Sequence, residues 1–362
     1  MERVRIGVIG LGQVAQVIHL PILEALAERY RIAALCDVSP GLLAAMGERY
    51  GVPAGARHAD YRELVARDDL DAVFVLNSDE YHADCTIAAA RQGKHVLVEK
   101  PMCLTLAEAG AIVRARDKAG VRVMVAYMRR FAPAFVQAVE EVRRLERINY
   151  VRVRDIIGRN HLIIEQSSAV LRPDDIPAEL TRDRAERAAR LVREAIGEAL
   201  PELPGLARVY RLLCGLSSHD LSAMRELLGF PRRVTSAECW NDGNFLTVLF
   251  DYGDYRALLE TGVDEQRRFD AHIEVYAPAI SLRVQYDTPF IRHLPTTLVI
   301  NETIGDAYTG RVIRPTFKDP YTHELEYFHD VVTNGVVPKT TPEDFMEDLR
   351  LFGMIIEALR KR

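Results

Sequence analysis

The chain has 362 residues, 48% of them hydrophobic, so it is long enough for two domains with sizeable cores. Its formal net charge is only −5 and no basic run stands out, which argues against a nucleic-acid partner. No apolar stretch approaches the roughly 18 residues of a membrane span, and the amino terminus has no apolar signal core, so we expect no membrane partner and a cytoplasmic location.

The first predicted element is a short buried strand over residues 4–9, which leads directly into a glycine-rich turn and then a helical stretch to about Glu28. The turn reads Gly10-Leu11-Gly12-Gln13-Val14-Ala15, a G-x-G-x-x-A pattern. The first glycine allows the tight turn, the second lets the backbone approach a pyrophosphate, and the alanine lets helix and strand pack closely. The helix start offers N–H groups and a positive dipole end to phosphates, so the motif predicts a dinucleotide site.

The second predicted strand, residues 32–36, ends in Asp37, which falls 22 residues after Ala15. That offset is close to the roughly 20 residues expected for a carboxylate that binds the adenine-ribose hydroxyls. Val38 and Ser39 follow, so no adjacent arginine is available for a 2′-phosphate. We therefore expect NAD rather than NADP. The alternative is that Asp37 is only a turn or N-cap residue.

Further apolar runs at residues 72–76, 96–98 and 121–125 alternate with helical patterns, which predicts a doubly wound parallel sheet through residue 126. The run at 96–98 leads into Glu99-Lys100-Pro101. Ligands of such sheets collect at the carboxyl ends of the strands. An amine there can exchange a proton with a substrate hydroxyl, which makes Lys100 the leading catalytic candidate. The alternative is a solvated lysine that caps the strand.

The pattern changes after about Phe131. A helix over 133–145 is followed by strand-like runs at 150–157 and from 234 to 315, separated by turn signals, and by two final helices at 321–334 and 342–360. Consecutive short strands predict a mostly antiparallel sheet. We therefore predict a dinucleotide-binding domain over 1–126 and an α+β domain over 127–362, with a helical insertion at about 160–204. That insertion is either a packing helix or a lid or subunit contact.

The cysteines are scattered, odd in number and never in C-x-x-C spacing, and the ten histidines form no H-E-x-x-H pair. This usage fits reduced thiols in the cytoplasm and argues against a metal site. The five cysteines are Cys36, Cys85, Cys103, Cys214 and Cys239.

The chain resembles the Gfo/Idh/MocA family over its first 130 residues. The resemblance rests on the glycine turn, on Asp37, on the segment Asn77–His82 and above all on the segment Gly93–Pro101. It implies a Rossmann domain, an open α+β domain, NAD(P)-dependent chemistry on a sugar or polyol, and oligomers formed through the second sheet. It also implies that Lys100 is the catalytic or substrate-positioning lysine and that its bond to Pro101 is cis. Glu99 would support the nicotinamide side, and Asn77 would lie near the nicotinamide ribose.

The chain departs from the family at one position. The family's Asp-x-x-x-His places both side chains on one helical face, whereas here Gly215 precedes His219 by four residues. His219 remains as the predicted proton acceptor. Asp220 is a candidate to orient His219 or to contact the substrate. Because Gly215 has no side chain, the chain could also have lost ordinary dehydrogenase chemistry. In the alternative interpretation, His219 only begins a helix, and Asp220 is an acidic residue that the helix dipole favours in the first turn.

The last candidates follow the strand that ends at Ala126. We expect Tyr127 and Arg129 on the substrate side, where Arg129 or Arg130 could hold a carboxylate or a sugar hydroxyl. The alternative is a solvated interdomain salt bridge.

The sequence thus favours a cytoplasmic, homo-oligomeric oxidoreductase. Two rivals stay open at this point: a glycosidase-like enzyme that oxidises its sugar transiently, and a sensor that binds NAD(P) without catalysis.

Overall fold

The computed structural model describes residues 3–197 and 205–361. The chain divides into two compact units, each built from three stretches. The first unit comprises Met1–Ala126, Ser168–Ala195 and Glu324–Leu349, and the second comprises Tyr127–Ser167, Ile196–His323 and Arg350–Arg362. Within the described residues, none of the helices has the length and apolarity needed to cross a membrane.

A six-stranded parallel sheet forms the centre of the first unit, in the order β3-β2-β1-β4-β5-β6. This order has a switch point between β1 and β4, which is the doubly wound arrangement that the sequence predicted. The strands are largely buried because helices cover both faces of such a sheet. They are β1 (Val4–Ile9), β2 (Tyr30–Cys36), β3 (Arg57–His58), β4 (Ala72–Val75), β5 (His95–Glu99) and β6 (Val123–Ala126).

Helices link these strands. The predicted first helix is shorter than expected: it begins as a π-helical turn, η1 (Ala15–His19), and continues as α1 (Leu20–Ala25). Helix α5 begins with a capping box: the Thr105 hydroxyl accepts from the Glu108 backbone N–H, and the Glu108 carboxylate accepts from the Thr105 backbone N–H. The linking helices are α2 (Pro40–Arg49), α3 (Tyr61–Val65), α4 (His82–Arg91) and α5 (Leu106–Ala119).

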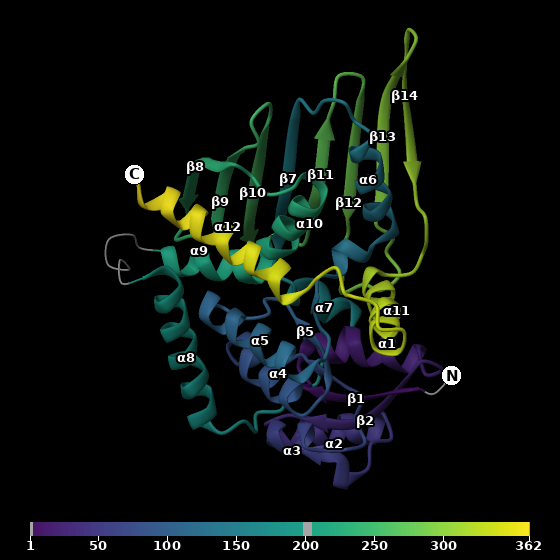
Figure 1. Cartoon of the computed structure of the whole chain (residues 1–362), viewed down its shortest axis with the longest axis vertical. Helices are drawn as coiled ribbons and strands as arrows, with labels where there is room; N and C mark the ends of the chain where they lie inside the picture. The colour runs from purple at the N-terminus through teal and green to yellow at the C-terminus, as the bar shows by residue number, and fades with distance from the viewer. Residues whose placement is uncertain (1–2, 198–204, 362) are drawn as a thin grey trace. The chain divides into compact units, whose positions relative to one another are not determined.

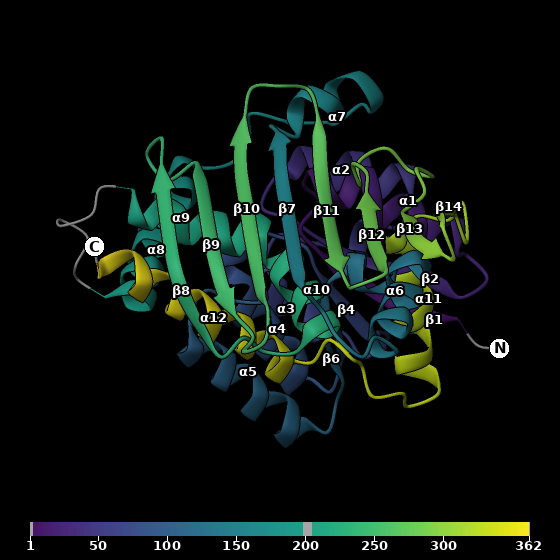
Figure 2. The same cartoon turned by 90° about the horizontal axis from the view of Figure 1, so that it is seen from above.

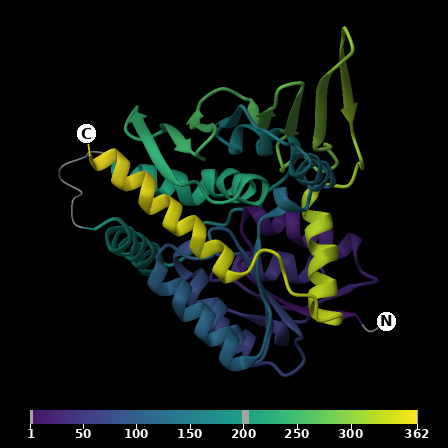
Figure 3. The same cartoon turned by 45° about the horizontal axis from the view of Figure 1, so that its top comes forward.

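Two distant stretches complete the first unit. The predicted insertion contains α7 (His161–Ser167), which belongs to the second unit, and α8 (Ala178–Ile196), which belongs to the first except for its last residue. Figures 1 and 3 show α8 alongside the helices of the first unit. Arg187 of α8 donates to the Glu80 carbonyl oxygen at 2.7 Å and to Asp84 at 2.5 Å. Residues 198–204, at the end of the predicted insertion, lie outside the described part of the chain.

The carboxyl-terminal stretch also contacts this sheet. The Tyr30 hydroxyl on β2 donates to the Leu325 carbonyl oxygen at 2.6 Å, and the Val125 N–H on β6 donates to the Thr340 carbonyl oxygen at 2.8 Å. Leu325 lies on α11 (Pro320–Thr333), which precedes the last helix, α12 (Pro342–Arg360). A distant piece of chain therefore satisfies backbone and hydroxyl groups of two strands of the first sheet.

The second unit contains an eight-stranded sheet in the order β14-β13-β12-β11-β7-β10-β9-β8 (Figure 2). Every pairing is antiparallel except that of β10 with β7, so the predicted mostly antiparallel sheet is confirmed. The strands are β7 (Tyr150–Gly158), β8 (Arg233–Trp240), β9 (Phe245–Asp251), β10 (Arg256–Asp264), β11 (Phe269–Tyr276), β12 (Ile280–Tyr286), β13 (Thr297–Ile304) and β14 (Ala307–Ile313).

The two faces of this sheet differ. On β7, buried Val151, Val153 and Asp155 alternate with half-buried Arg152 and Arg154. Helices α6 (Pro133–Arg143) and α10 (Ser218–Leu228) pack on the sheet, and α9 (Leu206–Leu212) leads into the turn before α10. Because Asp155 contacts α10, and because successive side chains of a strand point to opposite faces, the arginines lie on the face away from α10.

Candidate active site

The glycine turn uses its two glycines differently. Gly10 has φ +92°, and a Cβ built on it would lie 2.4 Å from the Asn77 backbone nitrogen, so the close approach of β1 to the end of β4 requires a glycine. Gly12 is exposed, and a Cβ built there would meet no atom of residues 3–197 or 205–361 within 4 Å. The open backbone at Gly12 therefore leaves room for a phosphate to approach the helix start.

Asp37 is tied to this turn. Its Oδ2 accepts from the Leu11 N–H at 2.7 Å and its Oδ1 from the Ser39 N–H at 2.9 Å. Burial raises the pKa of Asp37, although these N–H donors oppose the shift. The structure thus brings the predicted ribose ligand and the predicted phosphate loop together at the carboxyl ends of β1 and β2.

His82 links the next two strand ends. Its Nε2 lies 2.9 Å from the Asn77 carbonyl oxygen and its Nδ1 lies 2.8 Å from the Pro101 carbonyl oxygen. The Lys100–Pro101 peptide is cis, as the sequence resemblance implied. Among the described residues, the buried Oδ1 of Asn77 has no hydrogen-bond partner. A buried polar atom without a partner is costly, so this oxygen is suited to a ligand hydroxyl.

Glu99 and Lys100 end β5. The Glu99 Oε1 lies 2.8 Å from the His19 Nε2, and the backbone N–H of Lys100 donates to the Glu99 Oε2 at 3.1 Å. Burial is the largest influence on Glu99 and opposes its ionisation, but the hydrogen bond and charge of His19 together with the charges of Lys100 and His82 outweigh it, so the pKa of Glu99 is lowered. The Lys100 side chain is half-buried. His19 was not predicted, and its only local signal is a histidine between the apolar residues Ile18 and Leu20.

These features fit a dinucleotide. The open backbone at Gly12, the carboxylate of Asp37 and the unpartnered Asn77 oxygen follow one another along the carboxyl edge of β1, β2 and β4. In an open α/β sheet this edge, at the switch point, is where dinucleotides bind.

The second unit holds a buried ion cluster. Arg129 of the turn η4 (Met128–Phe131) donates from Nη1 to Asp220 at 2.5 Å and from Nη2 to Asp155 at 2.9 Å. Its guanidinium lies 4.8 Å from the centre of the Tyr286 ring. Burial raises the pKa of Asp220 well above its usual range; Arg129 opposes this shift and Asp155 adds to it. Asp220 therefore holds a proton more readily than an aspartate in water.

Both arginines of η4 bind α10. Arg130 donates to Glu226 at 2.5 Å, while Arg129 binds Asp220 in the first turn of the same helix. His219, next to Asp220, is buried on α10. The structure brings Arg129 and Asp220 together as buried partners rather than as a solvated bridge. Asp155 was missed, although a carboxylate on the inward, apolar side of an alternating strand was a usable signal.

Two other predicted positions are also defined. Tyr127 is fully buried at the start of the second unit. Gly215 is exposed in the π-helical turn η5 (Leu213–Ser217), and a Cβ built there would meet no atom within 4 Å in the part of the chain that the structure describes. Lys100 belongs to the first unit and His219 to the second. Their catalytic assignment, and the substrate assignment of Tyr127, Arg129 and Asp220, stay predictions.

Comparison with known proteins places this geometry in context. Residues 4–127 match the GFO_IDH_MocA family model, described as an oxidoreductase family with an NAD-binding Rossmann fold. A myo-inositol 2-dehydrogenase of Thermotoga maritima is 35% identical over 94% of this chain and 91% of that protein. An inositol 2-dehydrogenase of Salmonella typhimurium is 32% identical, but the match spans only 36% of this chain and 39% of that protein.

A solved structure agrees on the fold alone. The aldose–aldose oxidoreductase of Caulobacter crescentus has a TM-score of 0.71 at 23% identity, over 99% of this chain and 98% of that one. The predicted fold class and the predicted family resemblance are both confirmed.

Proposed function

Because the chain belongs to the Gfo/Idh/MocA oxidoreductase family, we propose that it is an NAD(P)-dependent dehydrogenase. It would transfer a hydride between a nicotinamide and the CH–OH carbon of a sugar or polyol. The observation that carries this proposal is the match with a myo-inositol 2-dehydrogenase along nearly the whole of both chains. The intact glycine turn supports it.

The proposed cofactor site follows the edge of the first sheet. The glycine turn would bind the pyrophosphate, Asp37 the adenine ribose and Asn77 the nicotinamide ribose, while Glu99 would hold the nicotinamide side. We propose NAD as the preferred cofactor, because Asp37 opposes a 2′-phosphate. The turn residues are Gly10, Gly12, Gln13, Val14 and Ala15.

The chain's own task is to move a proton. The bound nicotinamide supplies the hydride chemistry, so the hydroxyl proton of the substrate needs a separate acceptor. We assign its transfer to Lys100 and His219, with His219 as the acceptor near neutral pH. The buried clamp of Arg129 on Asp220 supports this role, because it fixes the helix turn that carries His219. Tyr127, Arg129 and Asp220 are the proposed substrate-side residues.

The test is a screen of inositols, aldoses and amino sugars with NAD and NADP in parallel. We expect reduced cofactor to accumulate with at least one polyol or sugar. Lys100→Ala should lower kcat by about a hundredfold or more, with the NADH dissociation constant changed little. Lys118→Ala, an exposed lysine on α5, is the matched control. A Lys100→Ala variant with full activity would remove the catalytic assignment, and dinucleotide binding without turnover on any substrate would favour a sensor.

Gly215 favours one second candidate. The missing aspartate would leave His219 without its family partner, which suits a mechanism that oxidises a sugar transiently and eliminates a substituent. Substrate cleavage with no net NADH formation would identify that chemistry. Accumulation of NADH with an oxidised, uncleaved product would exclude it.

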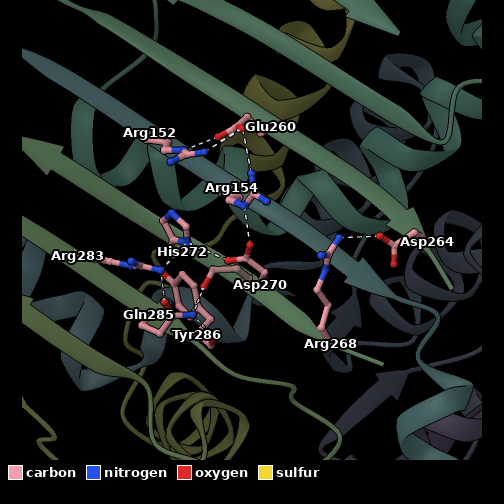
Figure 4. Close-up of polar contacts among 11 residues, drawn as sticks. Arg152, Arg154, Glu260, Asp264, Arg268, Asp270, His272, Arg283, Gln285 and Tyr286 are labelled. Carbon is pink, nitrogen blue, oxygen red and sulfur yellow. Dashed lines mark hydrogen bonds and ion pairs between the residues drawn. The ribbon is translucent and has the colours of Figure 1, made fainter. Parts of the chain in front are cut away.

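We also propose a homo-oligomer formed through the outer face of the second sheet. Figure 4 shows charged side chains on this face: Arg152 and Arg154 both bind Glu260, and Arg154 also binds Asp270. His272 lies 3.4 Å from Asp270. These groups lie on the face away from α10, and the proposed oligomer would place this face against another copy of the chain. We propose a cytoplasmic location, because the odd number and scattered positions of the cysteines fit reduced thiols.

A further inference from the structure

A short segment before α8 crosses the glycine turn of the first unit. We call residues 171–175 the strap. The Gln16 side chain bonds both backbone groups of Leu171: its Nε2 donates to the Leu171 carbonyl oxygen at 3.0 Å, and its Oε1 accepts from the Leu171 N–H at 2.9 Å. Arg172 donates to the Gln13 Oε1 at 2.8 Å. The strap is thus attached to the same turn that would hold the pyrophosphate.

The far end of the strap reaches the start of α2. The Asp175 Oδ2 accepts from the Gly41 N–H at 2.7 Å. Contact is close here, because a Cβ built on Gly41 would lie 2.9 Å from the Asp175 Oδ2 and 3.0 Å from the Pro173 Cγ. The Ser39 hydroxyl and the Gly41 N–H lower the pKa of Asp175, so this group is an anion. Burial raises the pKa of Asp37, and the negative charge of Asp175 raises it further.

The first turn of α2 is the place where a 2′-phosphate would find donors, since it directly follows Asp37. Its backbone positions either lack an N–H group or already donate it to an acceptor within the protein. Pro40 has no N–H, the Leu42 N–H donates to the Ser39 Oγ, and the Leu43 N–H donates to the Ser39 carbonyl oxygen. The remaining donor, Gly41, is taken by Asp175. A phosphate would therefore meet a carboxylate in place of an N–H group.

We propose that Asp175 is a second determinant of cofactor choice, which excludes the 2′-phosphate of NADP by occupying the α2 donor that would bind it. This inference rests on the proposed NAD(P)-dependent function and extends it. Asp37 would act through the ribose hydroxyls, whereas Asp175 acts through charge and through the donor it occupies. The selectivity is thus supplied from a segment more than a hundred residues away in the sequence.

The test measures binding rather than turnover. The dissociation constants of NADH and NADPH are determined by nicotinamide fluorescence for the wild-type protein and three variants. Asp175→Asn keeps an oxygen for the Gly41 N–H but removes the charge. It should tighten NADPH binding about tenfold, as expected for the loss of one close like-charge contact, and change NADH binding less than about threefold. Asp175→Glu keeps the charge and should keep the NADH preference.

Asp174→Asn is the matched control, because Asp174 is exposed and carries the same charge one residue away. It should leave both dissociation constants unchanged. Melting curves of all variants establish that each is folded. An NADH-to-NADPH ratio for Asp175→Asn equal to that of the control overturns the inference, as does a wild-type protein that binds NADPH as tightly as NADH. If the wild type binds neither dinucleotide, the proposed function fails instead.

Discussion

At the scale of single residues, the two glycines of the dinucleotide turn separate folding from binding. Gly10 is required by the fold, since its φ of +92° and the nearby Asn77 backbone exclude a side chain. Gly12 lies outside the left-handed region, and no described residue comes within 4 Å of a Cβ built on it. The motif therefore combines one glycine that the fold requires, Gly10, with one that leaves room for a ligand to approach the backbone, Gly12.

Substitution by alanine should weaken cofactor binding at Gly12 and lower stability at Gly10. Gly12→Ala should keep the wild-type melting temperature but weaken NADH binding about tenfold or more, because the methyl group would occupy the space of a phosphate. Gly10→Ala should lower stability by at least about 2 kcal/mol, because it combines left-handed strain with a backbone clash. Thermal melts and NADH titrations measure the two effects. Equal loss of stability in both variants would contradict this assignment.

The motif residues could be predicted from the sequence because each lies within a short local pattern. The partners of these residues could not. His19 contacts Glu99 across 80 positions, and Asp155 contacts Arg129 across 26. Local spacing does not encode such pairs, since they depend on which strands and helices become neighbours. For Asp155 alone, an inward carboxylate in an alternating strand gave a hint that it needed a buried partner.

At the scale of elements, α10 is held at two points by one turn. Arg129 binds Asp220 in the first turn of the helix, and Arg130 binds Glu226 six residues later. The Asp220 carboxyl is buried, and burial is the main reason that its pKa is raised. The native protein therefore binds a proton at Asp220 at pH values where the unfolded chain has released it. This coupling makes the clamp sensitive to pH.

The sign of the effect follows from proton linkage. Stability linked to protonated Asp220 is fully present below the unfolded pKa, about 3.9, and is lost as pH rises through the raised folded pKa. Asp220→Asn imitates the protonated form, so its melting temperature should fall less steeply with rising pH than that of the wild type. The difference in unfolding free energy between Asp220→Asn and the wild type should change by about 1 kcal/mol or more in favour of the variant over that pH range. Exposed Asp254→Asn should run parallel to the wild type, and a parallel Asp220→Asn curve would refute the linkage.

Most elements were predictable, and the exceptions have physical reasons. Strands and helices with a clear period of apolar residues appear where expected. The helix after the glycine turn begins as a π-helical turn, which apolar spacing at period 3.6 cannot reveal. The helical insertion that contains α8 was also predicted, but its contact with α4 was not, because Arg187 and Asp84 come together only in the folded chain.

At the scale of the whole molecule, the proposed oligomer has a direct test. Light scattering during gel filtration should give a mass above that of one chain at micromolar concentration. Glu260 binds both Arg152 and Arg154, so Glu260→Lys would gather positive charge on the outer face. We expect it to weaken self-association by about tenfold or more. Exposed Glu28→Lys is the matched control, and a monomeric wild-type protein would end the proposal.

The three-part construction of the first unit has a consequence for engineering. A chimera that transplants only residues 1–126 onto another scaffold would carry the glycine turn and Asp37 but leave behind the strap. It would also lose the carbonyl oxygens of Leu325 and Thr340 that satisfy Tyr30 and Val125. The exchangeable module is therefore discontinuous, and shuffling it between relatives calls for cutting the gene at several places rather than at one.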